Sequence, residues 1–295
     1  MITSLNLGIN GRLGNQLFQY AALRALGLKN NYEVKIPHPE SRAWHGQECL
    51  LNDFNIEADY LLDDDISKLQ HRYHERNYMD YDSDFFDTPD NSTVDGYFQS
   101  TYYFDEFEDQ IRKELTPNAE VLNRNKEYID KIRKDNHAEV VSIHLRRGDN
   151  TDGSNSSELL CNMYGAGDKH DDNSFFGRYL SDAKKVFDGK EVVFLVFSGG
   201  ARGEEDNSSD LDWCRANFSQ KQGFIIAAPA TPMDDFCRIM SCDHNIISHV
   251  SSFGWWAAYL NQRKKRTVVA PLNYHPDRPH YTHRKGFFPK DFVLV

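Results

Sequence analysis

The segment SIHLRRGD, residues 142–149, brings a histidine, two arginines and an aspartate close together. Arginine carries a permanently charged, planar guanidinium that can hydrogen-bond two oxygens of one anion. The β-branched run that precedes the arginines is typical of a covered parallel strand, so the charge falls where that strand ends. On an extended chain His144 and Arg146 share one face, whereas Arg147 points elsewhere or belongs to the turn. The pattern indicates a local anion site, with an open alternative in which the arginines pair with surface acids and His144 is a core residue.

A second group of polar residues follows an apolar strand near the C-terminal end of the sequence. In HNIISHVSSFGWWAAYL, residues 244–260, the strand ends at Ile247, and Ser251 and Ser252 stand where a helix should begin. Hydroxyls and amides at a helix N-terminus favour phosphate. The alternative is an ordinary serine N-cap above an aromatic core helix, and Trp255 and Trp256 are interpreted as packing residues.

A third candidate is the glycine-bearing turn NGRLGNQ, residues 10–16. The alternation of Leu5, Leu7 and Ile9 predicts a strand before it, and apolar residues at helical spacing predict a helix after it. Backbone amides in such a turn can meet a ligand, although a plain tight turn is equally compatible with the pattern. The residues that we take as candidates here are Gly14, Asn15 and Gln16.

These candidates require strands and helices that position them, and the strand-to-helix rhythm occurs twice along 295 residues. EVVFLVF (191–197) and GFIIAA (223–228) predict further buried strands of the second half, and the charged helical pattern KEYIDKIRKDN (126–136) indicates a boundary. In doubly wound α/β folds ligands bind beyond the carboxyl ends of the strands. We therefore expect an α/β protein with two domains, 1–135 and 136–295, and a ligand site beyond the carboxyl ends of the strands of the second.

Composition restricts the class of partner. The 34 basic and 45 acidic side chains give a net charge of -11, which argues against nucleic acid as a partner. No apolar stretch is long enough to span a bilayer, and the first residues lack a signal-peptide pattern, so we expect a cytoplasmic protein. Five scattered cysteines without a C-x-x-C pair favour reduced thiols. The sequence leaves the oligomeric state open.

Five motifs, in this order along nearly the whole chain, resemble those of the α-1,2-fucosyltransferases, glycosyltransferase family 11. They are GRLGNQLFQYA (11–21), DGYFQSTYYF with IRKEL (95–115), HLRRGD (144–149), DLDWCRANF (210–218) and HNIISHVSSFGWWAAYL (244–260). The resemblance implies a GT-B-type architecture with two Rossmann-like domains facing a cleft. The N-terminal domain, 1–135, would lie on the acceptor side, and the C-terminal domain, 136–295, would bind the nucleotide-sugar. The resemblance also implies GDP-L-fucose as donor substrate, a glycan acceptor such as galactose O-2, inversion at the anomeric carbon, and no cofactor or divalent metal.

The resemblance also implies roles for single residues. Arg146 would be the main pyrophosphate contact with Arg147 beside it, and His144 would contact the nucleotide or phosphate. Asp149 would orient the arginines or act in catalysis. The remaining donor-side candidates are Ser251 and Ser252 at the helix N-terminus, Gly14, Asn15 and Gln16 on the other wall, and Asp234 or Asp235 as a partner of guanine.

The general base stays open among Asp149, Asp152, Glu158 and His170, chosen for their nearness in sequence to the arginines. The acidic runs 63–65 and 234–235 leave room for a metal-binding transferase, although a solvated helix start suits the first run better. Two departures from the family pattern concern the donor site. Gly199 and Gly200 stand in place of an acidic pair, and Val250 and Gly254 replace polar residues. Another GDP-sugar, a protein acceptor, or a non-catalytic nucleotide-sugar or glycan-binding module are the alternatives.

Overall fold

The chain folds into two α/β units, each with its own parallel sheet. The computed structural model describes residues 1–39, 50–78, 80–148, 162–164, 170–199, 208–218, 222–274 and 286–295. Unit 1 consists of Met1–Asn118 with His283–Lys290, and unit 2 consists of Ala119–Thr282 with Asp291–Val295. The second unit thus begins at residue 119, whereas the sequence pattern placed the boundary at 135/136. The α/β class is confirmed, and the facing of the two domains across a cleft stays a prediction.

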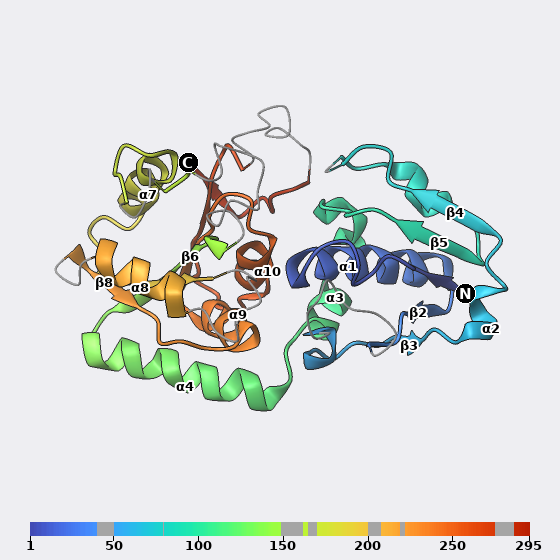
Figure 1. Ribbon diagram of the computed structural model, residues 1–295, viewed down its shortest axis with the longest axis horizontal. Helices are drawn as coiled ribbons and strands as arrows, with labels where there is room; N and C mark the ends of the chain where they lie inside the picture. The colour runs from blue at the N-terminus through green and yellow to red at the C-terminus, as the bar shows by residue number, and fades with distance from the viewer. Residues whose placement is uncertain are drawn as a thin grey trace. The chain divides into compact units, whose positions relative to one another are not determined.

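Within the described residues, unit 1 is a parallel sheet in the order β3-β2-β1-β5-β4, accompanied by helices (Figure 1). Its elements are β1 (Ile2–Thr3), α1 (Leu13–Asn30), β2 (Val34–Ile36), β3 (Asp59–Tyr60), α2 (Asp63–Ile66), β4 (His71–His74), β5 (Ser92–Asp95) and α3 (Glu108–Glu114).

The strand predicted from the alternation of Leu5, Leu7 and Ile9 is wrong. The strand β1 already ends at Thr3, and the chain then turns, with the Leu7 amide donating to Ser4 O (3.2 Å) and the Ile9 amide to Asn6 O (3.0 Å). Gly8 and Gly11 adopt positive φ angles in this segment, which an extended strand does not allow. The helix expected after the turn is confirmed as α1.

Unit 2 is a second parallel sheet, in the order β8-β7-β6-β9-β10-β11 over the described residues. Counted from β6, this is the order 3-2-1-4-5-6 of the dinucleotide-binding Rossmann fold. Its elements are α4 (Ala119–Asn136), β6 (Glu139–Leu145), α7 (Phe175–Lys185), β7 (Val192–Ser198), α8 (Ser208–Asn217), β8 (Phe224–Ile226), α9 (Pro232–Ser241), β9 (His244–Ile246), α10 (Ser252–Leu260), β10 (Val268–Ala270) and β11 (Val293–Leu294). The strands predicted at 191–197, 223–228 and 244–247 are confirmed as β7, β8 and β9.

The helix α4 belongs to unit 2 because polar contacts hold it against α9 (Figure 1). Arg124 Nη2 lies 2.8 Å from Asp234 Oδ1, Asn125 Nδ2 donates to the same oxygen, and Arg238 Nε donates to Asn125 Oδ1 (3.0 Å). A charged helix therefore marks the beginning of the second unit rather than the end of the first.

The two faces of β6 meet different neighbours. Val141, Ile143 and Leu145 are buried in an apolar cluster that also contains residues of α7 and Trp213 of α8. His144 alternates with these residues and points to the opposite face, toward α10, where its side chain reaches Ser251. The sheet thus presents consecutive residues at the end of β6 to helices on its two sides.

Candidate active site

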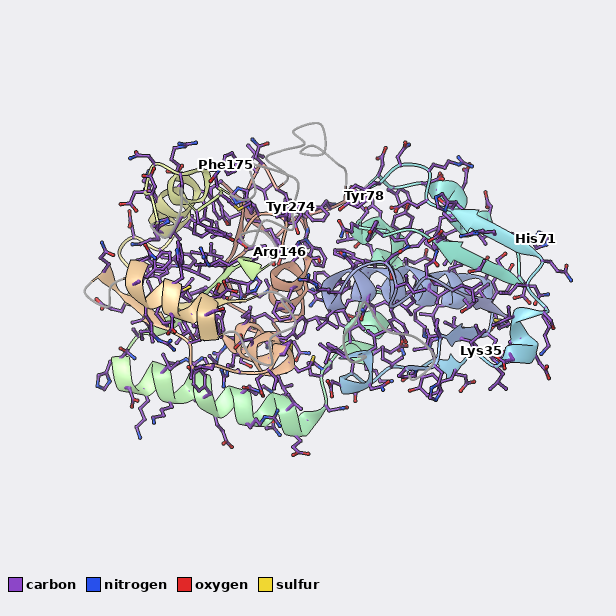
Figure 2. All side chains as sticks on the ribbon, viewed as in Figure 1. Lys35, His71, Tyr78, Arg146, Phe175 and Tyr274 are labelled. Carbon is purple, nitrogen blue, oxygen red and sulfur yellow. The ribbon has the colours of Figure 1, made fainter. Side chains whose placement is uncertain are left out.

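The arginines lie at the topological switch point of the unit 2 sheet. From β6 the chain continues to β7 on one side, whereas β9, the other neighbour of β6, is reached only later. Ligands of open α/β sheets bind at the carboxyl ends of strands at such a point. The strand β6 ends at Leu145, so Arg146 follows it directly, and Figure 2 labels Arg146 there.

Arg146 is held by the segment that follows β9. Its Nη1 donates a hydrogen bond to the carbonyl oxygen of Val250, two residues before the first residue of α10. Val250 has φ +48°, which is unusual for a β-branched residue and is typical of constrained functional segments. The Val250 amide donates to Tyr274 O (3.1 Å), so both backbone polar groups of Val250 have partners. The guanidinium is therefore anchored beside the N-terminus of a helix.

His144 and Ser251 form a buried pair next to Arg146. His144 Nδ1 lies 2.9 Å from Ser251 Oγ, and the same hydroxyl caps α10 by accepting from the Gly254 amide (3.1 Å). Burial, and then the charge of Arg146, lowers the pKa of His144 from 6.5 to about 3. His144 is therefore neutral at physiological pH and acts as a hydrogen-bonding group without charge. The prediction that Ser251 caps this helix is confirmed.

Gly254 gives His144 the space for this contact. A Cβ at Gly254 would lie 3.3 Å from Ser251 Oγ and 3.4 Å from His144 Nδ1, which is closer than most Cβ contacts. On the other side the His144 ring packs against Phe253, with ring centroids 5.1 Å apart. The glycine that departs from the family pattern thus fits a close approach between β6 and α10.

Arg147 points to the opposite side, as the strand alternation predicts. Its Nε lies 3.2 Å from Asp210 Oδ1, and its guanidinium carbon lies 3.7 Å from the centroid of the Trp213 ring. Burial lowers the pKa of Arg147, although Asp210 opposes that shift. Arg147 has partners within the chain, and its contact with phosphate stays a prediction. Asp210 is a residue that sequence reasoning missed as part of the site.

The other unit 2 candidates occupy different environments. Ser252 is the first residue of α10 and is half-buried. Asp234 accepts hydrogen bonds from α4 on Oδ1 and from Thr231 Oγ1 on Oδ2 (2.8 Å), so both oxygens have partners and guanine contact stays a prediction. His170 packs on Phe218, with ring centroids 5.0 Å apart. Asp149, Asp152, Glu158 and Gly200 lie outside the described residues.

The unit 1 candidates belong to the first turn of α1 rather than to a loop. The helix begins at Leu13, so Gly14, Asn15 and Gln16 are helical. Gln16 Nε2 donates to Gly11 O (3.1 Å), and Asn15 Oδ1 accepts from Gln99 Nε2 (2.7 Å). Gln99, which follows β5, was not found from the sequence because nothing local links it to Asn15.

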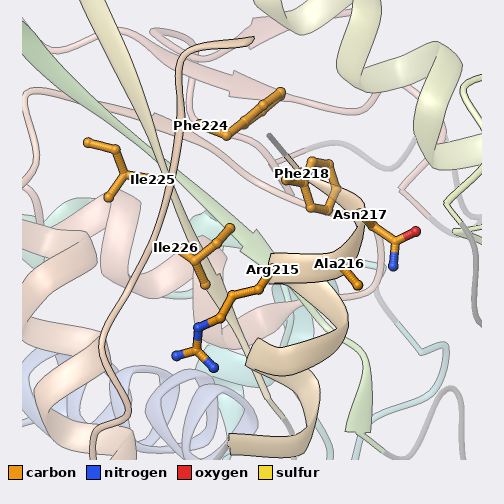
Figure 3. A pocket seen from close by; sticks show the side chains of 7 residues that line it. All are labelled: Arg215, Ala216, Asn217, Phe218, Phe224, Ile225 and Ile226. Atoms are coloured by element: carbon orange, nitrogen blue, oxygen red, sulfur yellow. The ribbon is translucent and has the colours of Figure 1, made fainter. Parts of the chain in front are cut away.

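Three kinds of feature could indicate a site other than the candidate residues: a metal-binding cluster, the acidic run 63–65 and a surface hollow. Among the described residues no group of three or more His, Cys, Asp or Glu side chains is arranged to hold a metal ion. The first residues of the acidic run 63–65 begin α2, and Asp65 pairs with Lys35 and Lys68. A hollow of about 510 Å³ lies between α8 and β8, lined by Arg215, Phe218 and Ile226 among others (Figure 3), and contains none of the candidates.

Curated relatives share most of this sequence. Galactoside alpha-(1,2)-fucosyltransferase 1 of Homo sapiens is 28% identical over 269 residues, which cover 85% of this chain and 64% of that protein. The type 2 enzyme of Rattus norvegicus is 27% identical over 260 residues, with coverage of 85% and 65%. The chain thus spans less than two thirds of the length of these relatives.

A solved structure is similar only at a coarse level. The fucosyltransferase NodZ from Bradyrhizobium is 14% identical, with a TM-score of 0.43 over 88% of this chain and 91% of that one. This value is too low to transfer residue roles. The sequence family model described as glycosyl transferase family 11, by contrast, matches residues 2–293. Together with the identities above, this match shows that the chain belongs to glycosyltransferase family 11.

Proposed function

We propose that this protein transfers L-fucose from GDP-L-fucose to a hydroxyl of a glycan, with galactose O-2 as the acceptor position and inversion at the anomeric carbon. The observation that carries the proposal is the anchored guanidinium of Arg146 at the switch point of a sheet with Rossmann order. Family membership and the names of the relatives support the donor and the acceptor.

The proposed reaction is a single displacement. The acceptor hydroxyl oxygen forms a bond to the anomeric carbon as the bond from that carbon to the β-phosphate oxygen breaks. The electron pair of the broken bond passes to the phosphate, and the hydroxyl proton passes to a base. The leaving GDP therefore gains negative charge in the transition state, and a preorganised cation stabilises that charge most effectively.

The residues of the site divide this work. Arg146 would meet the developing phosphate charge, and Val250 O holds its guanidinium in place. The amides at the start of α10 add partial positive charge, which favours phosphate. His144 is neutral and would orient the Ser251 hydroxyl without adding a further charge. Asp149 stays a proposed orienting or catalytic residue.

The location in the cell is part of the proposal. Cys214, Cys237 and Cys242 are buried free thiols, as expected in a reducing compartment such as the cytoplasm. No helix in the described ranges is long and apolar enough to cross a membrane. Fractionation of cells that express the protein tests the cytoplasmic assignment.

The decisive experiment combines a donor panel with a substitution of Arg146. The protein is incubated with GDP-L-fucose, GDP-mannose or a UDP-sugar and galactose-terminated acceptors, and mass spectrometry and NMR identify product and linkage. GDP-L-fucose should be used well ahead of the others. Arg146→Ala should lower kcat about 10² to 10³-fold, and Arg146→Lys should recover little because lysine lacks the planar fork.

Arg215→Ala is the matched control, since Arg215 is an exposed arginine of α8 that pairs with Asp212. It should retain wild-type turnover. Comparable rates with a UDP-sugar would contradict the donor assignment. Near wild-type turnover by folded Arg146→Ala would contradict the role of Arg146. GDP binding without turnover on any acceptor would favour a binding module.

A further inference from the structure

One buried carboxylate holds two consecutive residues of the turn that follows Arg146. Asp210 is 3% exposed. Its Oδ1 accepts from Arg147 Nε and its Oδ2 accepts from the Gly148 amide, each at 3.2 Å. Asp210 lies on α8, 63 residues away from Arg147 in sequence. The carboxylate therefore ties a distant helix to the end of β6.

The guanidinium of Arg147 is enclosed by residues one helical turn apart. Asp210 and Trp213 stand at i and i+3 on α8, so their side chains share a face of that helix. The carboxylate contacts the edge of the guanidinium, and the indole ring lies 3.7 Å from its central carbon. A buried arginine needs a paired anion, and Asp210 supplies it.

The turn itself has little freedom. Gly148 has φ +32°, and the Arg147 amide donates to Leu145 O (3.0 Å). Ser198 Oγ, at the end of β7, donates to the same carbonyl (3.1 Å). The backbone on both sides of Arg146 is thus fixed, on one side by the sheet and on the other by Asp210.

We propose that Asp210 is a positioning residue for Arg146. Asp210 acts on Arg146 through its contacts with Arg147 and the Gly148 amide. The inference rests on the proposed function, in which Arg146 binds the donor diphosphate. By pairing with Arg147, Asp210 keeps that guanidinium beside Trp213 of α8, on the opposite side of the sheet from the contact between Arg146 and Val250 O. By holding the turn, it keeps the Arg146 backbone where the Val250 carbonyl can anchor its side chain.

The test is Asp210→Asn, which preserves size and removes the charge. The measurements are kcat, KM for GDP-L-fucose, KM for the acceptor, and the Kd of GDP by calorimetry. Because a misplaced charged group can cost up to about 10²-fold in rate, we expect kcat to fall and the donor KM and GDP Kd to rise at least about tenfold. The acceptor KM should stay within about twofold, since Asp210 acts on the donor side.

Asp212→Asn is the matched control. Asp212 lies on the same helix, but it is exposed and pairs across one turn with Arg215. All four constants should match those of the wild type. If Asp210 works through Arg147, the effects of the two substitutions do not add. The double variant Asp210→Asn with Arg147→Gln should then have a kcat, a donor KM and a GDP Kd no worse than those of the more impaired single variant.

A rise in the donor KM and the GDP Kd without a change in the acceptor KM indicates positioning. If Asp210 only supported the fold, Asp210→Asn would lower the melting temperature and the active fraction but leave KM unchanged. Folded Asp210→Asn with wild-type donor KM and GDP Kd would overturn the inference. If Asp210→Asn does not fold, Arg147→Lys replaces it, because lysine keeps the charge but loses the Nε contact and the planar stacking. An equal loss on the acceptor side in that variant would also overturn it.

The two proposals fail in different ways. If the wild-type protein neither binds GDP nor uses a GDP-sugar, the proposed function fails. Suppose instead that the wild type binds GDP and that Arg146→Ala weakens this binding. If Asp210→Asn then leaves the binding unchanged, only the proposed role of Asp210 fails.

Discussion

Acidification should destabilise the protein through His144. The unfolded chain takes up a proton on this side chain near pH 6.5, whereas the buried imidazole resists protonation until about pH 3. Between these values the unfolded state binds one proton more, so the free energy of unfolding falls as the pH falls. One pKa unit corresponds to about 1.4 kcal/mol, so two pH units within this window remove on the order of 3 kcal/mol. Above pH 6.5 this contribution is fully present, and below about pH 3 no more is lost.

The assay is urea unfolding at several pH values between 7 and 4.5, followed by tryptophan fluorescence. Three of the four tryptophans, Trp213, Trp255 and Trp256, belong to unit 2, so most of the signal reports on the unit that contains His144. His144→Asn retains hydrogen-bonding capacity toward Ser251 but does not titrate, so its stability should depend less on pH by about 1.4 kcal/mol per unit. His71→Asn, at an exposed position of β4, is the control and should keep the wild-type slope. Equal slopes for wild type and His144→Asn would refute the reasoning.

Three further outcomes are expected. Activity should survive chelation of divalent ions because Arg146 and the α10 N-terminus are proposed to meet the phosphate charge, and a loss restored by magnesium would contradict this. Tyr20→Phe should lower the urea stability of unit 1 by about 1.5–3 kcal/mol, since it leaves the buried Glu114 carboxylate without the Tyr20 hydroxyl, 2.5 Å away; an unchanged midpoint would count against it. Gly11→Ala should cost about 1–3 kcal/mol, because φ is +92° and the new Cβ would meet Asn15 Nδ2 at 2.2 Å, which calorimetry checks.

The parts of the fold that follow from local pattern were predictable. The apolar run of β6 and the serine cap of α10 depend on neighbouring residues only, and both are where the sequence indicates. The alternation of Leu5, Leu7 and Ile9 misled because glycines with positive φ turn the chain there, and of these three side chains only Leu7 is buried while Ile9 is exposed. Local periodicity does not distinguish an extended strand from a turn in which apolar residues happen to alternate.

The parts of the site that depend on tertiary packing were not predictable. HLRRGD indicates that charge gathers at a strand end, but it does not say that Arg147 pairs with Asp210 on α8. The boundary at 135/136 had the same weakness, because α4 reads as a generic charged helix until its contacts with Asp234 and Arg238 are known. The signal for Asp210 was its place in the motif DLDWCRANF three residues before Trp213, a spacing that shares one face if the segment is helical, as it is in α8.

The segment that returns to unit 1 late in the sequence has a consequence for biosynthesis. Phe287 is buried and packs on Phe18, and the Thr101 amide donates to Gly286 O (2.6 Å). The N-terminal unit therefore lacks part of its core until the ribosome has translated almost all of unit 2. At about 5–20 residues per second this delay is on the order of ten seconds or more, during which the Phe287 ring is not yet available to cover Phe18 and the uncovered apolar surface favours aggregation. A nascent chain that stalls before residue 286 would present two unfinished units, so translation stalling in that region should yield products that are degraded rather than partly active.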